Sequence, residues 1–164
     1  RPPRRSRKEA SRLPHAVEVV HGTCVALGQR GALLRGSSGC GKSDLALRFL
    51  FLARRGPTAR EAPALVADDQ VVLTRDGRRV LATAPDSIGG RLEVRGVGIV
   101  GVKAIAQCVL ALVVDLVGPG EVERLPATLR VRLVGVELPL LRLAPFESSA
   151  PIKLALAVAH ASRS

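Results

Sequence analysis

Aromatic residues are scarce in this chain, which has no Trp, no Tyr and three Phe among 164 residues. Single-stranded nucleic acid is bound largely by stacking bases on aromatic rings, so this composition disfavours such a partner despite a net charge of +11. Residues 1–14 carry six Lys and Arg against one Glu. A segment so charged and Pro-containing cannot bury apolar area, and we expect a basic, disordered arm there, either solvated or in weak contact with an anion.

Paired cysteines and long apolar runs are also missing. The three cysteines, Cys24, Cys40 and Cys108, show no CxxC or Cys/His metal spacing, and their odd number is typical of free thiols in a reducing compartment. The longest apolar run, residues 109–118, is too short to cross a bilayer and contains Asp115. We therefore expect a cytoplasmic protein that does not insert into a membrane.

What the chain does have is enough apolar sequence for a core, at 47% of its residues. We predict one compact domain over residues 15–164. Alternation over Val17–Leu27 predicts a strand, and "GQRG" at 28–31 predicts a hairpin turn into "ALLRG" at 32–36. A helix should follow, because apolar residues recur at helical spacing until Gly56-Pro57; these are Leu45, Ala46, Phe49, Leu50 and Leu52.

The rest of the chain is mostly β-rich. Residues 64–73 form a β-rich run interrupted by two acids, and Asp76-Gly77 predicts a hairpin. Further extended segments are expected over residues 88–102, 108–117 and 127–143, before a C-terminal helix over 150–161. The predicted fold class is α/β: a P-loop domain with a mixed, strand-rich sheet, a helix after the Walker A loop and a C-terminal helix.

A phosphate-binding loop lies between the predicted strand and helix. "GSSGCGKS" matches GxxxxGK[ST] without a mismatch in the strand–loop–helix context that this motif requires. Glycines allow backbone N–H groups to approach phosphate oxygens at a helix N-terminus. Lys42 would neutralise the β- and γ-phosphates of a nucleotide, and Ser43 would hold Mg²⁺. The predicted nucleotide site comprises Gly36, Ser37, Ser38, Gly39, Cys40, Gly41, Lys42 and Ser43.

Such a site also needs an acid at the end of a buried strand. "LVADD", ending at Asp68 and Asp69, and "LVVD", ending at Asp115, fit this requirement equally well. Asp68 and Asp69 should face opposite ways, because neighbouring strand residues alternate. His21 and the pair Glu93 and Arg95 can be read in two ways, as site residues or as a structural histidine and a surface ion pair.

Four segments in this order, "HGTCVAL", "GALLRGSSGCGKSDLALRFL", "LVADDQV" and "RLEVRGVGIVGV", resemble the catalytic domain of HPr kinase/phosphorylase. The similarity extends over about residues 17 to 143 and is greatest to short family members that lack an N-terminal domain. The resemblance implies ATP- and Mg²⁺-dependent phosphorylation of a serine on the phosphocarrier HPr. Many family members also catalyse the reverse reaction, phosphorolysis, in which inorganic phosphate attacks the phosphoserine and forms pyrophosphate. The resemblance implies this reaction as a second activity.

Roles for individual residues come from the same resemblance. Lys42 becomes a catalytic phosphate contact, and Ser43 and Glu93 become the Mg²⁺ ligands. Asp69 is favoured as the proton acceptor with Asp68 as its partner. His21 matches the active-site histidine of the family, Arg95 belongs to the signature segment, and Asp115 becomes a structural strand end.

The chain departs from the longer family members before its C-terminal helix. They carry an arginine in a glycine-containing loop, where this chain reads "LAPFESSAPIKLALA" with Lys153 as the candidate substitute. The departure bears on phosphorolysis and on the homo-oligomer that the resemblance implies. Two alternatives are a small P-loop kinase or nucleotide hydrolase with another acceptor, and a non-catalytic nucleotide-sensing module.

Overall fold

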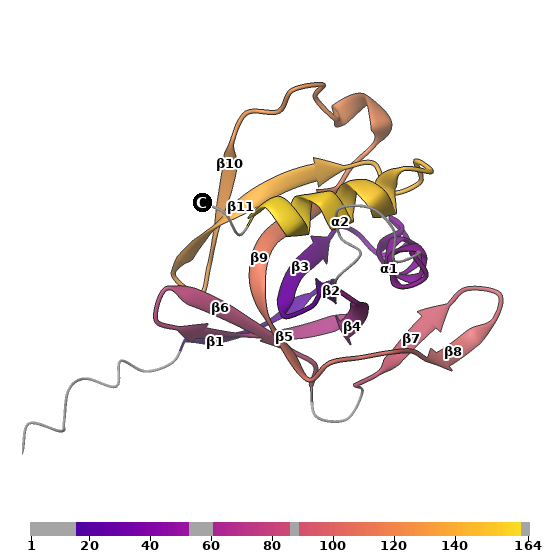
Figure 1. Ribbon diagram of the computed structural model, residues 1–164, viewed down its shortest axis with the longest axis horizontal. Coiled ribbons are helices and arrows are strands. Elements are labelled where there is room, and N and C mark those ends of the chain that lie inside the picture. The colour runs from indigo at the N-terminus through magenta and orange to yellow at the C-terminus, as the bar shows by residue number, and fades with distance from the viewer. Residues whose placement is uncertain (1–15, 53–60, 86–88, 162–164) are drawn as a thin grey trace, which may run out of the picture.

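The computed structural model describes residues 16–52, 61–85 and 89–161, which form a curved mixed sheet with two helices packed on one face (Figure 1). The helices are α1 (Lys42–Leu50) and α2 (Ala150–His160), with a 3₁₀ turn, η1 (Pro119–Glu121). The strands are β1 (Val17–His21), β2 (Thr23–Leu27), β3 (Arg30–Arg35), β4 (Pro63–Ala67), β5 (Gln70–Asp76), β6 (Arg79–Thr83), β7 (Arg91–Val94), β8 (Gly98–Gly101), β9 (Gln107–Leu116), β10 (Leu129–Leu133) and β11 (Val136–Leu143).

Strand β9 organises the nine-stranded sheet. It pairs in parallel with β3 along one edge; along the other it pairs antiparallel with β6 and then parallel with β11. The sheet order is β1-β5-β6-β9-β3-β2-β4, and β10 continues the sheet beyond β11. This confirms the predicted mixed, strand-rich sheet with a helix after the Walker A loop and a C-terminal helix.

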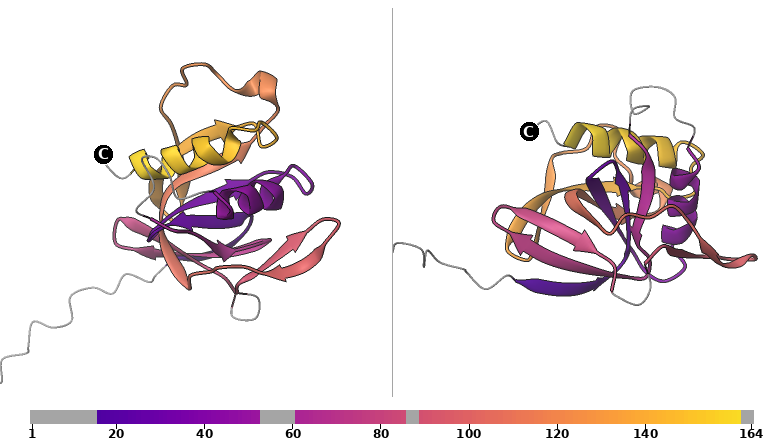
Figure 2. Two further views of the ribbon diagram at one scale, coloured as in Figure 1. Left: turned by 45° about the vertical axis from the view of Figure 1, so that its right-hand side comes forward. Right: turned by 60° about the horizontal axis from the view of Figure 1, so that its bottom comes forward.

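Two apolar clusters lie on opposite faces of the sheet. The first joins β2, β3 and β9 to the helices through side chains such as Phe49 of α1 and Leu154 of α2. The second is built from sheet residues and their connections, because the sheet curls over it (Figure 2). Strands buried on both faces read as continuous apolar runs, and in β3 Ala32 and Leu34 enter the first cluster while Leu33 enters the second.

Two buried cysteines meet in the second cluster. The Sγ atoms of Cys24 and Cys108 lie 3.7 Å apart, and both thiols are free. Their hydrogen bond and burial raise the pKa of the Cys24 thiol well above its ordinary value, because both favour the neutral form. Cys40 is also free, and it is partly exposed.

Gly22 divides the segment that the sequence predicted as one strand. β1 pairs with β5, whereas β2 pairs with β3 and β4. A Cβ added to Gly22 would lie 2.8 Å from the carbonyl oxygen of Leu34, so the chain bends where no side chain fits. The prediction of one continuous strand over Val17–Leu27 is therefore corrected to two strands.

The β2–β3 and β5–β6 hairpins turn where glycine signals predicted, and α2 begins at the predicted residue. The break between β4 and β5 falls at the two acids. Helix α1 ends at Leu50. Gly56-Pro57 and the arm over residues 1–14 lie outside the described residues.

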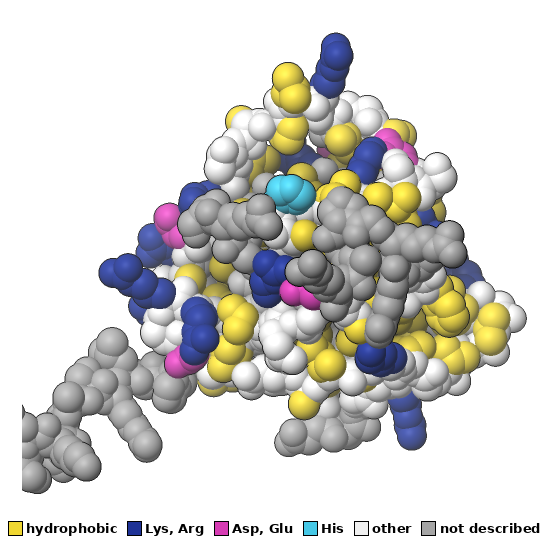
Figure 3. All heavy atoms as spheres, in the orientation of Figure 1, with side chains coloured by type: hydrophobic (Ala, Val, Ile, Leu, Met, Phe, Trp, Pro, Cys, Tyr) yellow, Lys and Arg dark blue, Asp and Glu magenta, His cyan; other side chains and the backbone are white. Residues whose placement is uncertain are grey.

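The β7–β8 hairpin forms a small separate sheet that projects from the body of the molecule (Figure 1). Buried Leu92 anchors β7 in the first apolar cluster. Hydrophobic side chains gather over the hairpin in Figure 3. Val97 and Ile99, both in this hairpin, are 74% and 72% exposed. None of the helices in the described part of the chain is long and apolar enough to span a bilayer.

Candidate functional site

The phosphate loop connects β3 to α1. Gly36, Gly39 and Gly41 all have positive φ, at 153°, 79° and 103°, which is the conformation that their lack of a side chain permits. Gly41 is the N-cap of α1, and no side chain caps this helix. The first N–H groups of α1 are therefore free of a side-chain acceptor and suited to an anion.

Lys42 is 7% exposed, and the loop holds its ammonium group. Its Nζ donates to the carbonyl oxygens of Gly36 and Ser37 at 2.8 and 2.9 Å. Neutral carbonyls compensate part of the cost of burying this charge but carry no negative charge to balance it. The cation is thus held inside the loop in a form that an incoming phosphate can pair with.

Asp68 is the centre of a hydrogen-bond network that joins three elements. Its Oδ1 accepts hydrogen bonds from the hydroxyls of Thr23, at 2.8 Å, and Ser43, at 3.1 Å, and its Oδ2 accepts one from the backbone N–H of Glu93, at 3.3 Å. Thr23 is fully buried, so its hydroxyl depends on this carboxylate. The network brings the end of β4 against the start of α1 and fixes β7 beside them.

Asp69 faces a different environment from its neighbour. It has a φ of 67°, and the hydrogen bond from Gln70 N to Asp68 O, at 2.8 Å, closes a three-residue turn around it. Its Oδ1 lies 3.3 Å from Nδ1 of His21, with the two side chains 74% and 52% exposed. A residue held in this uncommon backbone region next to an ionisable partner is a reason to look for function.

The β7–β8 hairpin carries Glu93 and Arg95, and only Glu93 is bonded to the network. Glu93 is tied to the network through its backbone N–H, and the residue is exposed. Arg95 is exposed in the turn, and within the described residues its side chain forms neither a hydrogen bond nor an ion pair. The surface ion pair between Glu93 and Arg95, which the sequence left open, is not present.

Asp115, the candidate acid at the end of β9, forms an ion pair with Arg35. The parallel register of β3 and β9 sets Arg35 beside Asp115, and the guanidinium donates to both carboxylate oxygens at 2.8 and 3.0 Å. Such a two-point ion pair is a structural contact. Of the three acids in the two segments that the spacing allowed, only Asp68 is hydrogen-bonded to Ser43.

The donor set near Ser43 suits a hard cation. Ser43, Asp68 and Glu93 offer a hydroxyl and two carboxylates, which are the oxygen ligands that Mg²⁺ prefers. No group of three His, Cys, Asp or Glu in the described segments converges as a metal cage. Mg²⁺ is commonly held by one or two carboxylates together with substrate phosphates and water.

Two site features have no clear sequence signal. Thr23 is an ordinary strand residue in the sequence, and only folding sets it against Asp68. Phe146 packs near the loop, since a Cβ added to Gly41 would lie 2.9 Å from its Cζ atom. The scarcity of aromatic residues was the one signal that would have singled out Phe146.

Comparisons with known proteins agree on one family. Residues 14–143 match the model of the HPr Serine kinase C-terminal domain. HPr kinase/phosphorylase of Chlorobium phaeobacteroides (strain BS1) is 38% identical over 138 residues, covering 77% of this chain and 38% of that protein. The enzyme of the same name from Limosilactobacillus reuteri (strain DSM 20016) is 39% identical over 87 residues, 52% of this chain and 24% of that protein.

The fold has a solved counterpart. The structure of the HPr(Ser) kinase/phosphatase from Coxiella burnetii superposes with a TM-score of 0.71 at 20% sequence identity, covering 87% of this chain and 94% of that one. At this identity the likeness concerns the fold. The chain spans less than half the length of the curated relatives it matches.

Proposed function

This chain belongs to the family of the HPr Serine kinase C-terminal domain, and on that premise we propose that it is a protein serine kinase. It transfers the γ-phosphate of ATP, in the presence of Mg²⁺, to a serine hydroxyl of HPr or a related phosphocarrier protein. The observation that carries the proposal is the network in which Asp68 joins Ser43 of the phosphate loop to β7, beside the exposed Asp69 and His21.

The loop supplies the nucleotide part of the proposed site. Lys42 exchanges its two carbonyl partners for phosphate oxygens, and the uncapped N–H groups of α1 bind the same group. Ser43 and Glu93, with Asp68 hydrogen-bonded to Ser43, would hold Mg²⁺. When bound, this ion neutralises charge on the β- and γ-phosphates. Phosphoryl transfer needs mostly alignment and charge neutralisation, which this set of residues provides.

Asp69 supplies the acceptor part of the proposed site. As the serine oxygen attacks the γ-phosphorus, the serine proton passes to a carboxylate oxygen of Asp69, and the bond to the ADP oxygen breaks. His21, 3.3 Å away, positions that carboxylate. The exposure of both side chains suits an acceptor that arrives on a second protein. Arg95 is assigned to this acceptor side, where it would meet the carrier.

We include reverse phosphorolysis in the proposal. Asp69, now protonated, would return its proton to the serine oxygen while inorganic phosphate takes the phosphoryl group to give pyrophosphate. Lys153, the candidate substitute for the arginine of the longer family members, lies on α2, where its Nζ donates to Glu147. It must leave that ion pair to contact a phosphate, so we expect the reverse reaction to be the weaker one.

The proposal extends to the setting of the protein. We propose a cytoplasmic homo-oligomer with a catalytic domain over residues 15–164 and a separate basic arm over 1–14. The free state of all three cysteines supports a reducing compartment. Light scattering of the purified chain would measure its mass in solution, and a monomer would contradict the homo-oligomer.

One assay tests the central claim. The purified protein is incubated with Mg²⁺, ATP and an HPr-type carrier, and the carrier is examined for phosphoserine by mass spectrometry. A carrier that stays unlabelled while ATP is hydrolysed would indicate another acceptor. ATP that binds without turnover would indicate a nucleotide-sensing module. Adding phosphate to the labelled carrier and measuring pyrophosphate tests the reverse reaction.

A further inference from the structure

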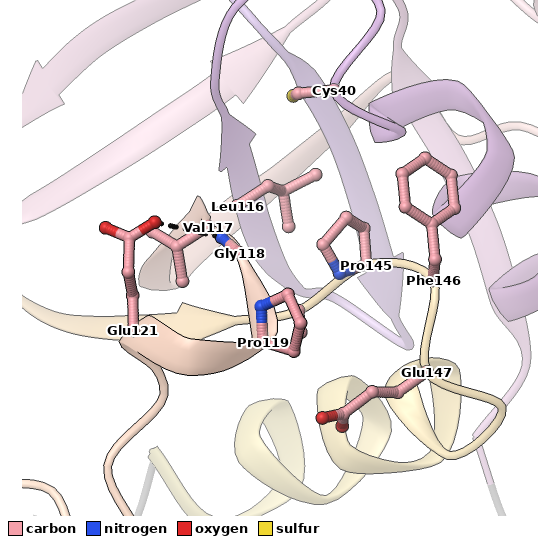
Figure 4. A pocket seen from close by; sticks show the side chains of 10 residues that line it. Cys40, Leu116, Val117, Gly118, Pro119, Glu121, Pro145, Phe146 and Glu147 are labelled. Carbon is pink, nitrogen blue, oxygen red and sulfur yellow. Dashed lines mark hydrogen bonds between the residues drawn. The ribbon is translucent and has the colours of Figure 1, made fainter.

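A pocket of about 640 Å³ adjoins the phosphate loop at Cys40, and its volume is typical of small-molecule sites. None of Asp68, Asp69 and Glu93 lines it. Its walls come from the loop, the end of β9 with η1, and the segment between β11 and α2 (Figure 4). Most of the lining is apolar, including Leu116, Val117, Pro119, Pro145 and Phe146.

Phe146 is the aromatic residue of this pocket. The chain has three Phe and no Trp or Tyr, and the other two Phe lie elsewhere: Phe49 is buried in the core and Phe51 follows α1. The Phe146 ring is 70% exposed, which leaves a large apolar surface in water. Its Cζ atom lies close to the backbone of Gly41, so the ring adjoins the phosphate loop itself.

The segment that carries Phe146 is held against α1. Arg48 donates from Nη1 to the carbonyl oxygen of Glu147, at 3.2 Å, and from Nη2 to that of Pro145. The same guanidinium pairs with Asp44 at 2.8 Å. Because the residues on both sides of Phe146 are fixed to the helix that begins at the loop, the segment that carries the ring has a defined position relative to the phosphate loop.

We propose that this pocket holds the ribose and base of the nucleotide whose phosphates lie on residues 36–43, with the base stacked on Phe146. The inference rests on the proposed function and assigns its nucleoside subsite. A nucleotide anchored by its phosphates must lay the rest of the molecule on an adjoining surface. The side with Asp68, Asp69 and Glu93 is polar and acidic, whereas the Cys40 side offers an apolar cavity and a ring.

The polar groups of the pocket limit how the base is read. Glu121 accepts a hydrogen bond from the backbone N–H of Gly118 at 3.1 Å, and Glu147 pairs with Lys153. Both acids that line the pocket are therefore already engaged. Recognition falls mainly to contact with the ring and the surrounding apolar side chains, and stacking of a base on an aromatic ring is insensitive to the identity of the base.

The test compares ATP with inorganic tripolyphosphate, which keeps the phosphates and lacks the nucleoside. Both are titrated calorimetrically with Mg²⁺ into the wild type, Phe146→Ala and the matched control Phe51→Ala, whose residue is 77% exposed at the far end of α1. We expect Phe146→Ala to weaken ATP binding by at least about fivefold and to leave tripolyphosphate binding unchanged. Phe51→Ala should change neither.

The outcomes separate the two proposals. A wild type that binds neither ligand would overturn the proposed function and this subsite with it. A wild type that binds both ligands equally well, or a Phe146→Ala variant with unchanged ATP affinity, would overturn the subsite alone. Equal losses for ATP and tripolyphosphate in Phe146→Ala would also overturn it, because the ring would then act on the phosphate loop.

Cys40 provides a second readout. The other two cysteines are buried, at 0% and 2% exposure, so a bulky maleimide reagent applied to the folded protein reports on Cys40. We expect ATP at saturation to slow this labelling more than tripolyphosphate at saturation does, because the nucleoside covers the pocket wall. Equal protection by the two ligands would count against the nucleoside subsite.

Discussion

Two clusters of the site differ in how much of their geometry the fold itself determines. In the inner cluster, Thr23, Lys42, Ser43 and Asp68, the hydroxyls of Thr23 and Ser43 donate to Asp68, the ammonium group of Lys42 is held by loop carbonyls, and Thr23 and Lys42 are buried. The outer cluster, His21, Asp69, Glu93 and Arg95, is exposed, and its side chains share a single contact, between His21 and Asp69. Preorganised groups can hold a nucleotide before the acceptor arrives, whereas exposed groups can be completed by a second protein.

The largest effect should come from the outer cluster. Asp69→Asn keeps the size of the side chain and tolerates the φ of 67°, since Asn enters this region more readily than most residues. We expect phosphoserine formation to fall by about 10²- to 10⁴-fold with ATP affinity unchanged, the loss typical of a missing general base. Asp76→Asn, at the remote end of β5, is the control. If Asp69→Asn still transfers phosphate, the proton acceptor is Asp68.

Lys42→Ala tests the inner cluster. We expect transfer to fall by about 10²- to 10³-fold, because a buried cation aimed at the developing phosphate charge is lost. Rates are compared at saturating carrier and at several ATP concentrations. The exposed Lys103 provides the matched control as Lys103→Ala. Full activity of Lys42→Ala would exclude the phosphate role of this residue.

Glu93→Gln tests whether the hairpin takes part in metal binding. The neutral amide is a poorer Mg²⁺ ligand, so the Mg²⁺ concentration for half-maximal rate should rise by about tenfold, and excess Mg²⁺ should restore the rate. Glu18→Gln, an exposed change on β1, should leave the Mg²⁺ dependence unaltered. A loss of rate that Mg²⁺ does not restore would assign Glu93 to the acceptor instead.

The smallest effect should appear in the free energy of unfolding, which should respond differently to substitutions at Asp68 and at Asp69. Asp68→Ala leaves the buried Thr23 hydroxyl without its acceptor, at a cost of about 1–3 kcal/mol. Asp69→Asn should stay within about 0.5 kcal/mol, since its side chain is exposed. Urea unfolding measures both. Asp68→Ala is also measured in a Thr23→Val background. If the loss of unfolding free energy is as large there as in the wild type, the Thr23–Asp68 hydrogen bond is not the source of that loss.

Much of the fold could be predicted because its signals are local. The hairpin turns, the strand before the loop, the start of α1 and the C-terminal helix each depend on residues adjacent in the chain. The bend at Gly22 could not be predicted in this way. Its cause is the carbonyl oxygen of Leu34 on the neighbouring strand, which blocks a side chain at that point.

In the candidate site, too, local features could be predicted from the sequence and long-range contacts could not. The phosphate loop is a contiguous motif, so the sequence by itself predicted where a phosphate would bind and which lysine would accompany it, and it determined that a loop and a helix follow the strand. Spacing alone left the choice between the pair Asp68 and Asp69 and the single Asp115 open, because both follow apolar strands. The family resemblance favoured the pair, but only the tertiary structure shows what each acid contacts: the β3–β9 register sets Asp115 beside Arg35, and the fold brings Thr23 to Asp68, 45 residues away. Such contacts depend on strand order, which spacing along the chain does not encode.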